Sequence, residues 1–295
     1  MLRARITRRA LLGAGVAAAG YAGAVEPGFR LRVQHWQVSP PLWPRGQRLR
    51  IVALADPHLC EPHMPLSRFR RIIARANGLG GDLIVLLGDY LAGHDLVTGL
   101  VPVAEIAAAM SELEAPLGVY AILGNHDWWG DAAAQARGAG PTALHAALAE
   151  AGVTLLENDA LKLSYRGLGF WLAGIGDPIA FLTRSPRPAK RGVDNFDRMM
   201  DQITDEAPAI LLLHEPDFWP RWRDRFALSL AGHTHGGQVR LLGWSPVVPS
   251  SFGQRFAYGP VLEEDRLMVV SGGLGCSILP VRFGMPPEIT VVEVA

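Results

Sequence analysis

The sequence predicts an α/β sandwich with helices on its outer faces. Short apolar runs of strand length alternate with segments of helical periodicity along most of the 295 residues. Hydrophobic residues make up 49% of the chain and charged residues 19%, so the chain can bury a sizeable core. Several polar motifs follow directly on apolar runs, which is where ligand sites gather in open α/β sheets. The chain is therefore expected to carry a site at the ends of its strands.

Strands and helices are expected in turn in the first part of the domain. Apolar runs predict strands over residues 49–55, 83–87 and 119–123. Apolar residues at helical spacing predict a helix that ends at Asn77-Gly78. The same spacing predicts further helices over 103–113 and 142–151.

The pattern changes after residue 151. Short strands separated by turn residues indicate a meander over 153–157, 161–165 and 170–175. A polar loop rich in Pro and Arg over 183–191 precedes a predicted helix over 193–203. The remaining apolar runs predict strands over 210–213, 227–231, 238–242, 267–271 and 289–294.

The first 24 residues are typical of a targeting segment. The pair Arg8-Arg9 precedes a short apolar stretch, and Ala22-Gly23-Ala24 offers a cleavage site of small residues. The paired arginines resemble the twin-arginine export signal. We therefore expect an exported protein, either periplasmic or at the extracytoplasmic face of a membrane, with an uncleaved anchor as the alternative. The apolar stretch is too short to predict a membrane-spanning helix.

Residues 25–47 contain four prolines, which favours an extended lead-in and a domain over 48–295. The 28 basic residues balance the 28 acidic residues, and without a basic excess no nucleic-acid partner is expected. Two cysteines are too few for a thiol-rich zinc motif. Cys60 and Cys276 are therefore either buried thiols or, in an exported protein, a disulfide.

Five polar motifs share one position, directly after an apolar run. They are Asp56-x-His58, Gly88-Asp89, Gly124-Asn125-His126-Asp127, His214 and Gly232-His233-Thr234-His235. Imidazole nitrogens and carboxylate oxygens together suit borderline divalent metals such as zinc, manganese or iron. Asp56 and His58 are two residues apart, as are His233 and His235, and on a strand-like segment both members of each pair would project to one side. Asp89 is free to bridge two cations, which repel each other unless an anion lies between them.

Each motif alone has an ordinary explanation as a turn, a core histidine or a helix cap. Their joint occurrence in this order favours a metal site. The ordered set resembles the calcineurin-like metallophosphoesterase superfamily, and in particular its exported bacterial members, whose pattern is D-x-H, GD, GNH[DE], H and GHxH. The resemblance implies a four-layer αββα sandwich of two mixed sheets flanked by helices, with the site at one edge.

The resemblance also implies the ligands of two divalent metal ions. One metal would take Asp56, His58, Asp89 and His235, and the other would take Asp89, Asn125, His214 and His233. A hydroxide held between the metals would attack phosphorus. His126 would stabilise the phosphoryl oxygens or protonate the leaving oxygen, and Asp127 would hold His126 in orientation.

The expected reaction is hydrolysis of a phosphodiester, phosphomonoester or pyrophosphate. Related enzymes cleave UDP-diacylglucosamine, which makes a lipid-linked pyrophosphate an alternative substrate, but GNHD here departs from the GNRD usual in those enzymes. A non-catalytic metal-binding envelope protein is the alternative of another class. It would lack Asp89 or the pair His126 and Asp127, and all three are present.

Two further features bear on partners. Arg282 suits either binding of the substrate phosphate or a structural ion pair, because a guanidinium offers a planar fork of donors. Tryptophans such as Trp128 and Trp129 suit either core packing or contact with a lipid tail or membrane surface. Membrane-surface association is therefore a further expectation.

Overall fold

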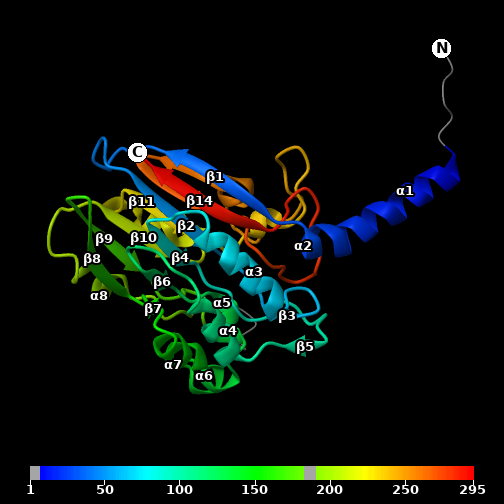
Figure 1. Ribbon diagram of the computed structural model, residues 1–295, viewed down its shortest axis with the longest axis horizontal. Coiled ribbons are helices and arrows are strands. Elements are labelled where there is room, and N and C mark those ends of the chain that lie inside the picture. Colours follow the sequence, from blue (N-terminus) through cyan, green and yellow to red (C-terminus); the bar gives the residue numbers. More distant parts are fainter. Residues whose placement is uncertain (1–6, 183–190) are drawn as a thin grey trace, which may run out of the picture.

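Two mixed sheets of six strands each pack face to face, and helices cover their outer faces (Figure 1). This computed structural model describes residues 7–182 and 191–295. The predicted polar loop over 183–191 therefore lies outside the described residues except for its last residue. The two layers of sheet between two layers of helix are the architecture that the sequence predicted.

The first sheet carries four adjacent parallel strands. Its strand order is β1 (Arg32–Val38), β14 (Glu288–Val294), β2 (Leu49–Leu54), β4 (Leu83–Leu86), β6 (Val119–Ala121) and β7 (Thr154–Leu155). The pair β14–β2 is antiparallel and the other pairs are parallel. The strands β2, β4 and β6 therefore end at the same edge.

The second sheet repeats this plan. Its strand order is β12 (Gly259–Glu263), β13 (Arg266–Val270), β11 (Leu228–Ala231), β10 (Ala209–Leu213), β9 (Leu168–Gly174) and β8 (Asp159–Tyr165). The outer pairs β12–β13 and β8–β9 are antiparallel, and the four inner strands are parallel. Two short strands, β3 (Cys60–Glu61) and β5 (Gly99–Leu100), pair outside both sheets.

Helices are distributed over both outer faces. The first sheet is covered by α3 (Leu66–Asn77), α4 (Val103–Met110) and α7 (Ala143–Glu150), with α5 (Asn125–Trp129) and α6 (Ala132–Arg137) nearby. The second sheet is covered by α8 (Phe196–Met200) and α9 (Trp219–Trp222). Single turns of 3-10 helix lie at Pro216–Phe218, Arg223–Arg225, His235–Gly237 and Gly253–Phe256.

The alternation of side chains along buried strands produces three apolar layers. In β2, Ile51 belongs to the core between the two sheets, whereas its neighbour Val52 belongs to the core under α3 and α4. In β10, Leu212 likewise faces the other sheet and Leu211 faces α9. Successive strand residues point to opposite faces, so a strand that is apolar throughout fits a sheet covered on both sides.

Residues 25–47, expected as a lead-in, belong to the folded domain. The strand β1 is the edge strand of the first sheet, in parallel register with β14 from Arg32–Glu288 to Val38–Val294. The prolines flank this strand and do not interrupt it: Pro27 lies in α2 (Glu26–Phe29), and the others follow residue 38. The ordered domain thus begins well before residue 48.

Two other elements differ from expectation. The predicted meander is divided between the sheets, because β7 pairs with β6 in the first sheet while β8 and β9 form a hairpin in the second. Residues 238–242 form no named strand. Gln238 and Leu242 have left-handed backbone with φ of 58° and 50°, which ends any extended run on both sides, and isolated bridges remain at Val239 and Leu241.

The helix α1 (Arg8–Gly20) extends away from the body (Figure 1). A turn of π-helix (Tyr21–Val25) and then α2 join it to the domain. The backbone N–H of Arg282 donates to the carbonyl oxygen of Ala22 over 2.9 Å, and that of Met285 donates to the buried carboxylate of Glu26 over 2.8 Å. In the described part of the chain, no helix has the length and apolar character needed to cross a membrane.

Candidate metal centre

The predicted ligands meet where the parallel strands of both sheets end. Asp56 and His58 follow β2, Asp89 follows β4, and Asn125 begins α5 after β6. His214 follows β10, and His233 and His235 follow β11. The structure thus brings all seven predicted ligands to one edge of the sandwich, four from the first sheet and three from the second.

Six of these residues form two triads. In each triad, one ligand atom from every member lies within 4.8 Å of the others. One triad is Asp56, His58 and His235, and the other is Asp89, His214 and His233. The seventh predicted ligand joins the second triad, because Oδ1 of Asn125 lies 3.0 Å from Nδ1 of His233. The two sets match the two predicted metal positions.

Asp89 lies between the two triads. Its Oδ2 is 3.1 Å from Nε2 of His214 in its own triad and 3.6 Å from Nε2 of His58 in the other. Its Oδ1 accepts the backbone N–H of His126 over 2.8 Å, which fixes the carboxylate. This is the position that a bridging carboxylate needs.

Left-handed backbone directs most of the ligands. The φ values are 52° at Asp56, 44° at His58, 60° at Asp89, 70° at His233 and 53° at His235. The sequence had suggested that Asp56 and His58, like His233 and His235, project to one side because they alternate on a strand. The structure shows that this explanation is wrong. The strands have already ended, and sharp turns aim the side chains; such conformations are unfavourable for non-glycine residues and concentrate at functional sites.

Glycines make room for the close packing of the centre. A Cβ on Gly124 would lie 2.4 Å from Oδ1 of Asp89, and a Cβ on Gly93 would lie 2.6 Å from Nδ1 of His58. Contacts this short are not tolerated, so both positions require glycine. The GNHD motif thus needs its glycine for space, while its Asn supplies an oxygen that can bind a metal.

Backbone carbonyls set the tautomers of two histidines. Nδ1 of His58 lies 2.8 Å from the carbonyl oxygen of Leu91, and Nδ1 of His214 lies 2.6 Å from that of Leu87. Since a carbonyl only accepts, each Nδ1 carries a hydrogen, and Nε2 is the nitrogen that faces the centre. Oδ2 of Asp56 is buried there without a hydrogen-bond partner. The imidazole nitrogens and carboxylate oxygens that face the centre are ligands suited to two divalent cations.

Burial governs the protonation of the centre. It raises the pKa of Asp56 to about 7 and lowers the pKa of His58 and of His233 to about 3, so both imidazoles are neutral ligands. Burial also opposes a charge on His214, but the carboxylate of Asp89 outweighs it and raises the pKa of His214 well above its ordinary value. A cation bound there would take the place of that proton.

Arg282 lies behind the centre and away from the substrate side. Its side chain is fully buried, with 0% exposure, and all five of its N–H donors are engaged. Four go to the carbonyl oxygens of Gly272, Met285 and Gly275, the last accepting two, and one from Nη2 goes to Nδ1 of His235 over 3.1 Å. The expected contact with a substrate phosphate therefore has no free donor, and Arg282 positions His235 instead.

The contact with Arg282 also sets the tautomer of His235. A guanidinium only donates, so Nδ1 of His235 accepts and the ring hydrogen lies on Nε2. That nitrogen lies 3.1 Å from Nε2 of His58, which is the acceptor. A metal held between these two nitrogens would replace this hydrogen bond.

Asp127 has a different partner from the expected one. Its carboxylate accepts the backbone N–H groups of Gly124, Asp89, Tyr90 and Leu91 over 2.7–3.1 Å. Asp127 therefore holds the loop that carries Asp89, and its oxygens are occupied by backbone donors and not by the imidazole of His126. The side chain that meets His126 is Ser277, whose Oγ lies 3.2 Å from Nε2 of the ring.

His126 lies at the rim of the centre. Its ring packs edge-on against that of His58, with 4.9 Å between ring centroids, and its Nε2 faces Ser277. The sequence identified His126 from its motif but gave no signal for Ser277, which follows the glycine-rich stretch near the C-terminus. Their contact spans 151 residues and depends on the tertiary fold.

Two hollows open from the metal centre. One, with a volume of about 270 Å³, is lined by Asp89, His126, His233 and His235 at its base. The other, of about 640 Å³, is lined by Asn125, His126 and His233. Ser277, Ile278 and Pro249 line both. The smaller hollow thus touches both triads, and the larger one touches the second triad through His233.

The two cysteines are free thiols in this structure. Both are buried and line one small cavity together with His58. Burial raises the pKa of both thiols, so they are protonated and poorly nucleophilic at neutral pH. The structure thus agrees with the expectation of buried thiols and contains no disulfide between them.

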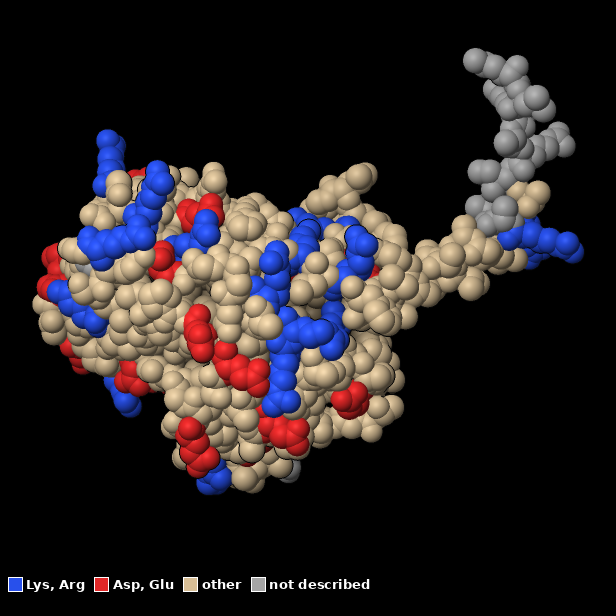
Figure 2. Space-filling model, viewed as in Figure 1, with Lys and Arg blue, Asp and Glu red and all other residues tan. Residues whose placement is uncertain are grey.

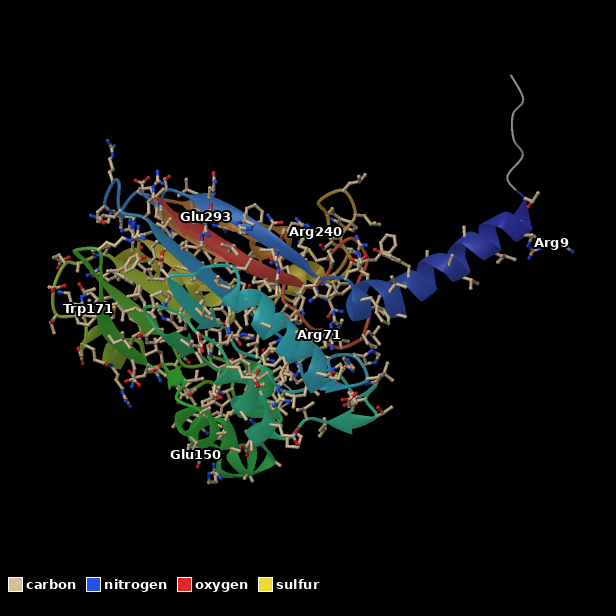
Figure 3. All side chains as sticks on the ribbon, in the orientation of Figure 1. Arg9, Arg71, Glu150, Trp171, Arg240 and Glu293 are labelled. Atoms are coloured by element: carbon tan, nitrogen blue, oxygen red, sulfur yellow. The ribbon has the colours of Figure 1, made fainter. Side chains whose placement is uncertain are left out.

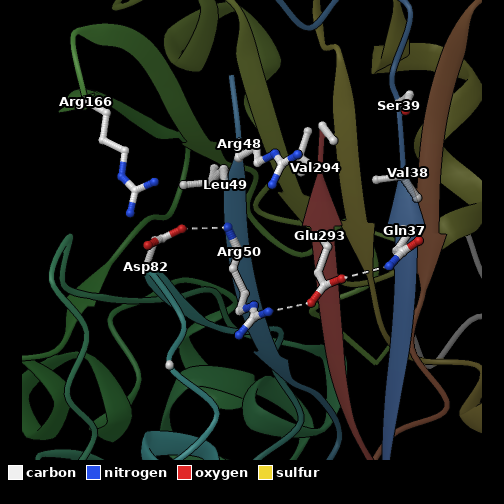
Figure 4. A pocket seen from close by; sticks show the side chains of 12 residues that line it. Gln37, Val38, Ser39, Arg48, Leu49, Arg50, Asp82, Arg166, Glu293 and Val294 are labelled. Atoms are coloured by element: carbon white, nitrogen blue, oxygen red, sulfur yellow. Dashed lines mark hydrogen bonds and ion pairs between the residues drawn. The ribbon is translucent and has the colours of Figure 1, made fainter. Parts of the chain in front are cut away.

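Another hollow, of about 760 Å³, lies at the amino end of β2, away from the triads (Figure 4). Arg50 in its wall donates from the backbone to Asp82 and from the side chain to Glu293, each over 2.7 Å. None of the seven metal-ligand candidates lines it. Its charged lining consists of Arg48, Arg50 and Arg166 with Asp82 and Glu293, and we assign no chemistry to it.

Comparison with known proteins agrees with this geometry. The chain is 30% identical to the metallophosphoesterase YkuE of Bacillus subtilis, over 92% of this chain and 88% of that protein. It is 28% identical to the phosphodiesterase YaeI of Escherichia coli, over 93% and 92%. It is 30% identical to a transmembrane protein with a metallophosphoesterase domain from Danio rerio, over 82% of this chain and 52% of that protein. Residues 49–237 match the calcineurin-like phosphoesterase family, a stretch that takes in every strand end bearing a ligand, and the chain belongs to this family.

Proposed function

We propose that the protein hydrolyses phosphodiesters with two divalent metal ions held by the two triads. The observation that carries this proposal is the position of Asp89, whose Oδ2 lies between His58 and His214 and so between two sets of buried donors. Two cations bridged in this way suit an in-line displacement at phosphorus, because both the attacking and the leaving oxygen can be stabilised.

A diester is favoured over other esters because the site opens in two directions. The hollows meet at His126 and His233, so a substituent can extend from phosphorus into each. Among the described lining residues there is no Lys or Arg, so the extra charge of a monoester or a pyrophosphate would meet no further cation. A UDP-diacylglucosamine-type pyrophosphate is less suited for the same reason. The relative from Escherichia coli carries the name phosphodiesterase.

The chain's own residues position the two triads and protonate the leaving oxygen. When bound, the metals would activate water and neutralise the charge on the phosphoryl oxygens. Asp89 keeps the two triads in register, and Asp127 fixes the loop of Asp89 through backbone N–H groups. His126 donates a proton to the leaving oxygen, and its ring is oriented by Oγ of Ser277, which lies 3.2 Å from Nε2.

The donor set supports zinc, manganese or iron as the metals. Four imidazoles, two carboxylates and one amide oxygen form the two sets. Imidazole nitrogen suits these borderline ions, whereas calcium and magnesium favour oxygen ligands.

We also propose that residues 1–24 direct export and place the domain at the extracytoplasmic face of a membrane. Arg8 and Arg9 begin α1, and the rest of this helix is apolar or glycine, so it forms an arm without acidic residues and with basic side chains only toward its outer end (Figure 2). Arg9 lies at that end, remote from the body (Figure 3). The zebrafish relative carries the name of a transmembrane protein. Sequencing the mature N-terminus from a periplasmic and a membrane fraction tests this proposal, and an intact chain in the cytoplasm would overturn it.

The test of activity compares two aryl phosphates on protein of known metal content. We expect hydrolysis of bis(p-nitrophenyl) phosphate to exceed that of p-nitrophenyl phosphate, with zinc, manganese or iron bound. His126→Ala should lower kcat for the diester about a hundredfold without loss of metal, because general-acid catalysis contributes on this order. Protein that holds two metals and turns over neither compound would overturn the proposal.

A further inference from the structure

Ile278 has an unusual conformation at the mouth of the site. Its φ is 66°, in the left-handed region, which a β-branched residue adopts only under strain. Its side chain is 73% exposed, so packing against the described residues does not account for this strain. The fold thus directs a large apolar side chain into solvent beside the metal centre.

The backbone around Ile278 is held in place by several hydrogen bonds. Its N–H donates to the carbonyl oxygen of Gly93 over 2.9 Å, and the N–H of Ser277 donates to Oε1 of Gln238 over 2.6 Å. Ser277 in turn meets His126 through Oγ. The position of Ile278 relative to the metal centre is therefore fixed.

Ile278 lines both hollows, and its exposed side chain is here called the ridge. The smaller hollow continues along Val247 and Leu279, which are 68% and 53% exposed. The larger continues along Trp129 and Phe181. Away from the metal ligands, the walls on both sides of the ridge are thus mainly apolar.

The charge of these walls, like their apolar character, favours an uncharged apolar ligand. Outside the triads, Asp217 is the charged side chain that lines either hollow among the described residues, and its carboxylate already accepts from Ser250 and Ser251. The described walls of the hollows offer no counter-charge to a polyanionic substituent such as a nucleotide. A hydrocarbon substituent would bury apolar surface against the ridge.

We infer that Ile278 and the two hollows beside it are substrate subsites for apolar groups on both sides of the phosphorus. The substrate class is a phosphodiester whose two alcohols carry aryl or alkyl groups. Hydrolysis breaks one P–O bond, water supplies the new one, and the leaving alcohol takes a proton. This inference rests on the proposed function and adds to it the identity of the substituents.

The experiment uses two diesters with the same leaving group. Bis(p-nitrophenyl) phosphate places an aryl group in each hollow, whereas methyl p-nitrophenyl phosphate places a methyl group in one of them. Ile278→Asn removes the apolar ridge, and Asn tolerates left-handed backbone, so the variant should unfold at the same temperature or higher. We expect its kcat/KM for the bis-aryl ester to fall about tenfold, mainly through KM, and for the methyl ester, which keeps one aryl group beside residue 278, only about threefold.

Leu242→Asn is the matched control. Leu242 is also left-handed, with a φ of 50°, and fully exposed, but it lines neither hollow. This variant should leave both substrates unchanged. If Ile278→Asn lowers both rates equally, or neither, the apolar subsites are refuted while the phosphodiesterase proposal stands. Metal-loaded wild-type protein that hydrolyses neither diester would instead refute the proposed function.

Discussion

The two sheets supply different chemistry to the metal centre. The first contributes both carboxylates and the amide, with a single histidine, and the second contributes only histidines. Each triad nevertheless takes members from both sheets: Asp56 and His58 join His235, and Asp89 joins His214 and His233. Neither sheet by itself therefore provides all the ligands of a triad.

This division has a consequence for stability. The core between the sheets is made of aliphatic side chains, whose burial is favourable but non-directional. The triads, in contrast, fix specific atoms of one sheet against specific atoms of the other. Metals bound in both triads would therefore link the sheets at the edge where their strands end.

Replacing the shared carboxylate should have the largest effect. Asp89→Ala removes the anion between the two triads, so both metals should bind weakly and kcat should fall at least about a thousandfold. Asp265→Asn is the control, because it neutralises a carboxylate in the turn between β12 and β13, at a left-handed position that Asn accepts. Metal content by mass spectrometry and kcat should change only in the first variant. Retention of both metals by Asp89→Ala would show that the sheets are not joined through this residue.

Metal removal tests the link between the sheets directly. Stripping both ions with a chelator should lower Tm by about 20 °C, since ligands at a thousand times their Kd contribute about 4 kcal/mol each and one kcal/mol shifts a domain of this size by a few degrees. Calorimetry before and after removal gives the value, and re-addition of metal should restore it. An unchanged Tm would mean that the aliphatic core alone holds the sheets in register.

Arg282 distinguishes the two triads. It contacts His235 and no other ligand through a hydrogen bond, so Arg282→Lys should weaken the metal held by Asp56, His58 and His235 about tenfold to a hundredfold and leave the other metal in place. Titration calorimetry should resolve one weakened site. Arg221→Lys, on the exposed side of α9, should leave both affinities unchanged. Equal weakening of both sites would show a general loss of structure and refute a positioning role.

The smallest effect is expected at the N-terminal segment. Glu26→Ala leaves the buried N–H of Met285 without its acceptor and should lower the free energy of unfolding by about 1–3 kcal/mol. Glu26→Gln keeps a carbonyl acceptor and should lose less. Denaturant unfolding of the two variants measures the difference, and equal losses would mean that this hydrogen bond contributes nothing.

The sequence predicted the parts of the site that depend on local order along the chain. Asp56, Asp89 and His214 follow buried strands, and the ends of parallel strands meet at one edge, so their proximity could be inferred. The roles of Asp127 and Arg282 could not be inferred in this way. Their side chains are aimed at backbone atoms in loops, and such partners are set by tertiary contacts that leave no pattern in the sequence.

The edge strand β1 shows the same limit on a larger scale. Most of its side chains are only partly buried, so its apolar pattern is weak, and prolines on both sides gave it the character of a linker. Its pairing with β14 joins residues 256 apart in the chain. The left-handed turns at the ligands are likewise invisible in composition, although Gly124 and Gly93 mark the crowding around them.

The contact between Ala22 and Arg282 joins the N-terminal segment to the metal centre. The carbonyl oxygen of Ala22 accepts from the residue whose guanidinium orients His235, so the chain beside the cleavage motif and the metal centre share one arginine. In a chain cut after Ala24, that acceptor is gone, and a new ammonium group at Val25 stands next to the buried carboxylate of Glu26. Proteolytic maturation would then alter the hydrogen bonds of the turn that supports a metal ligand, and the processed and unprocessed forms would differ in how they load their metals.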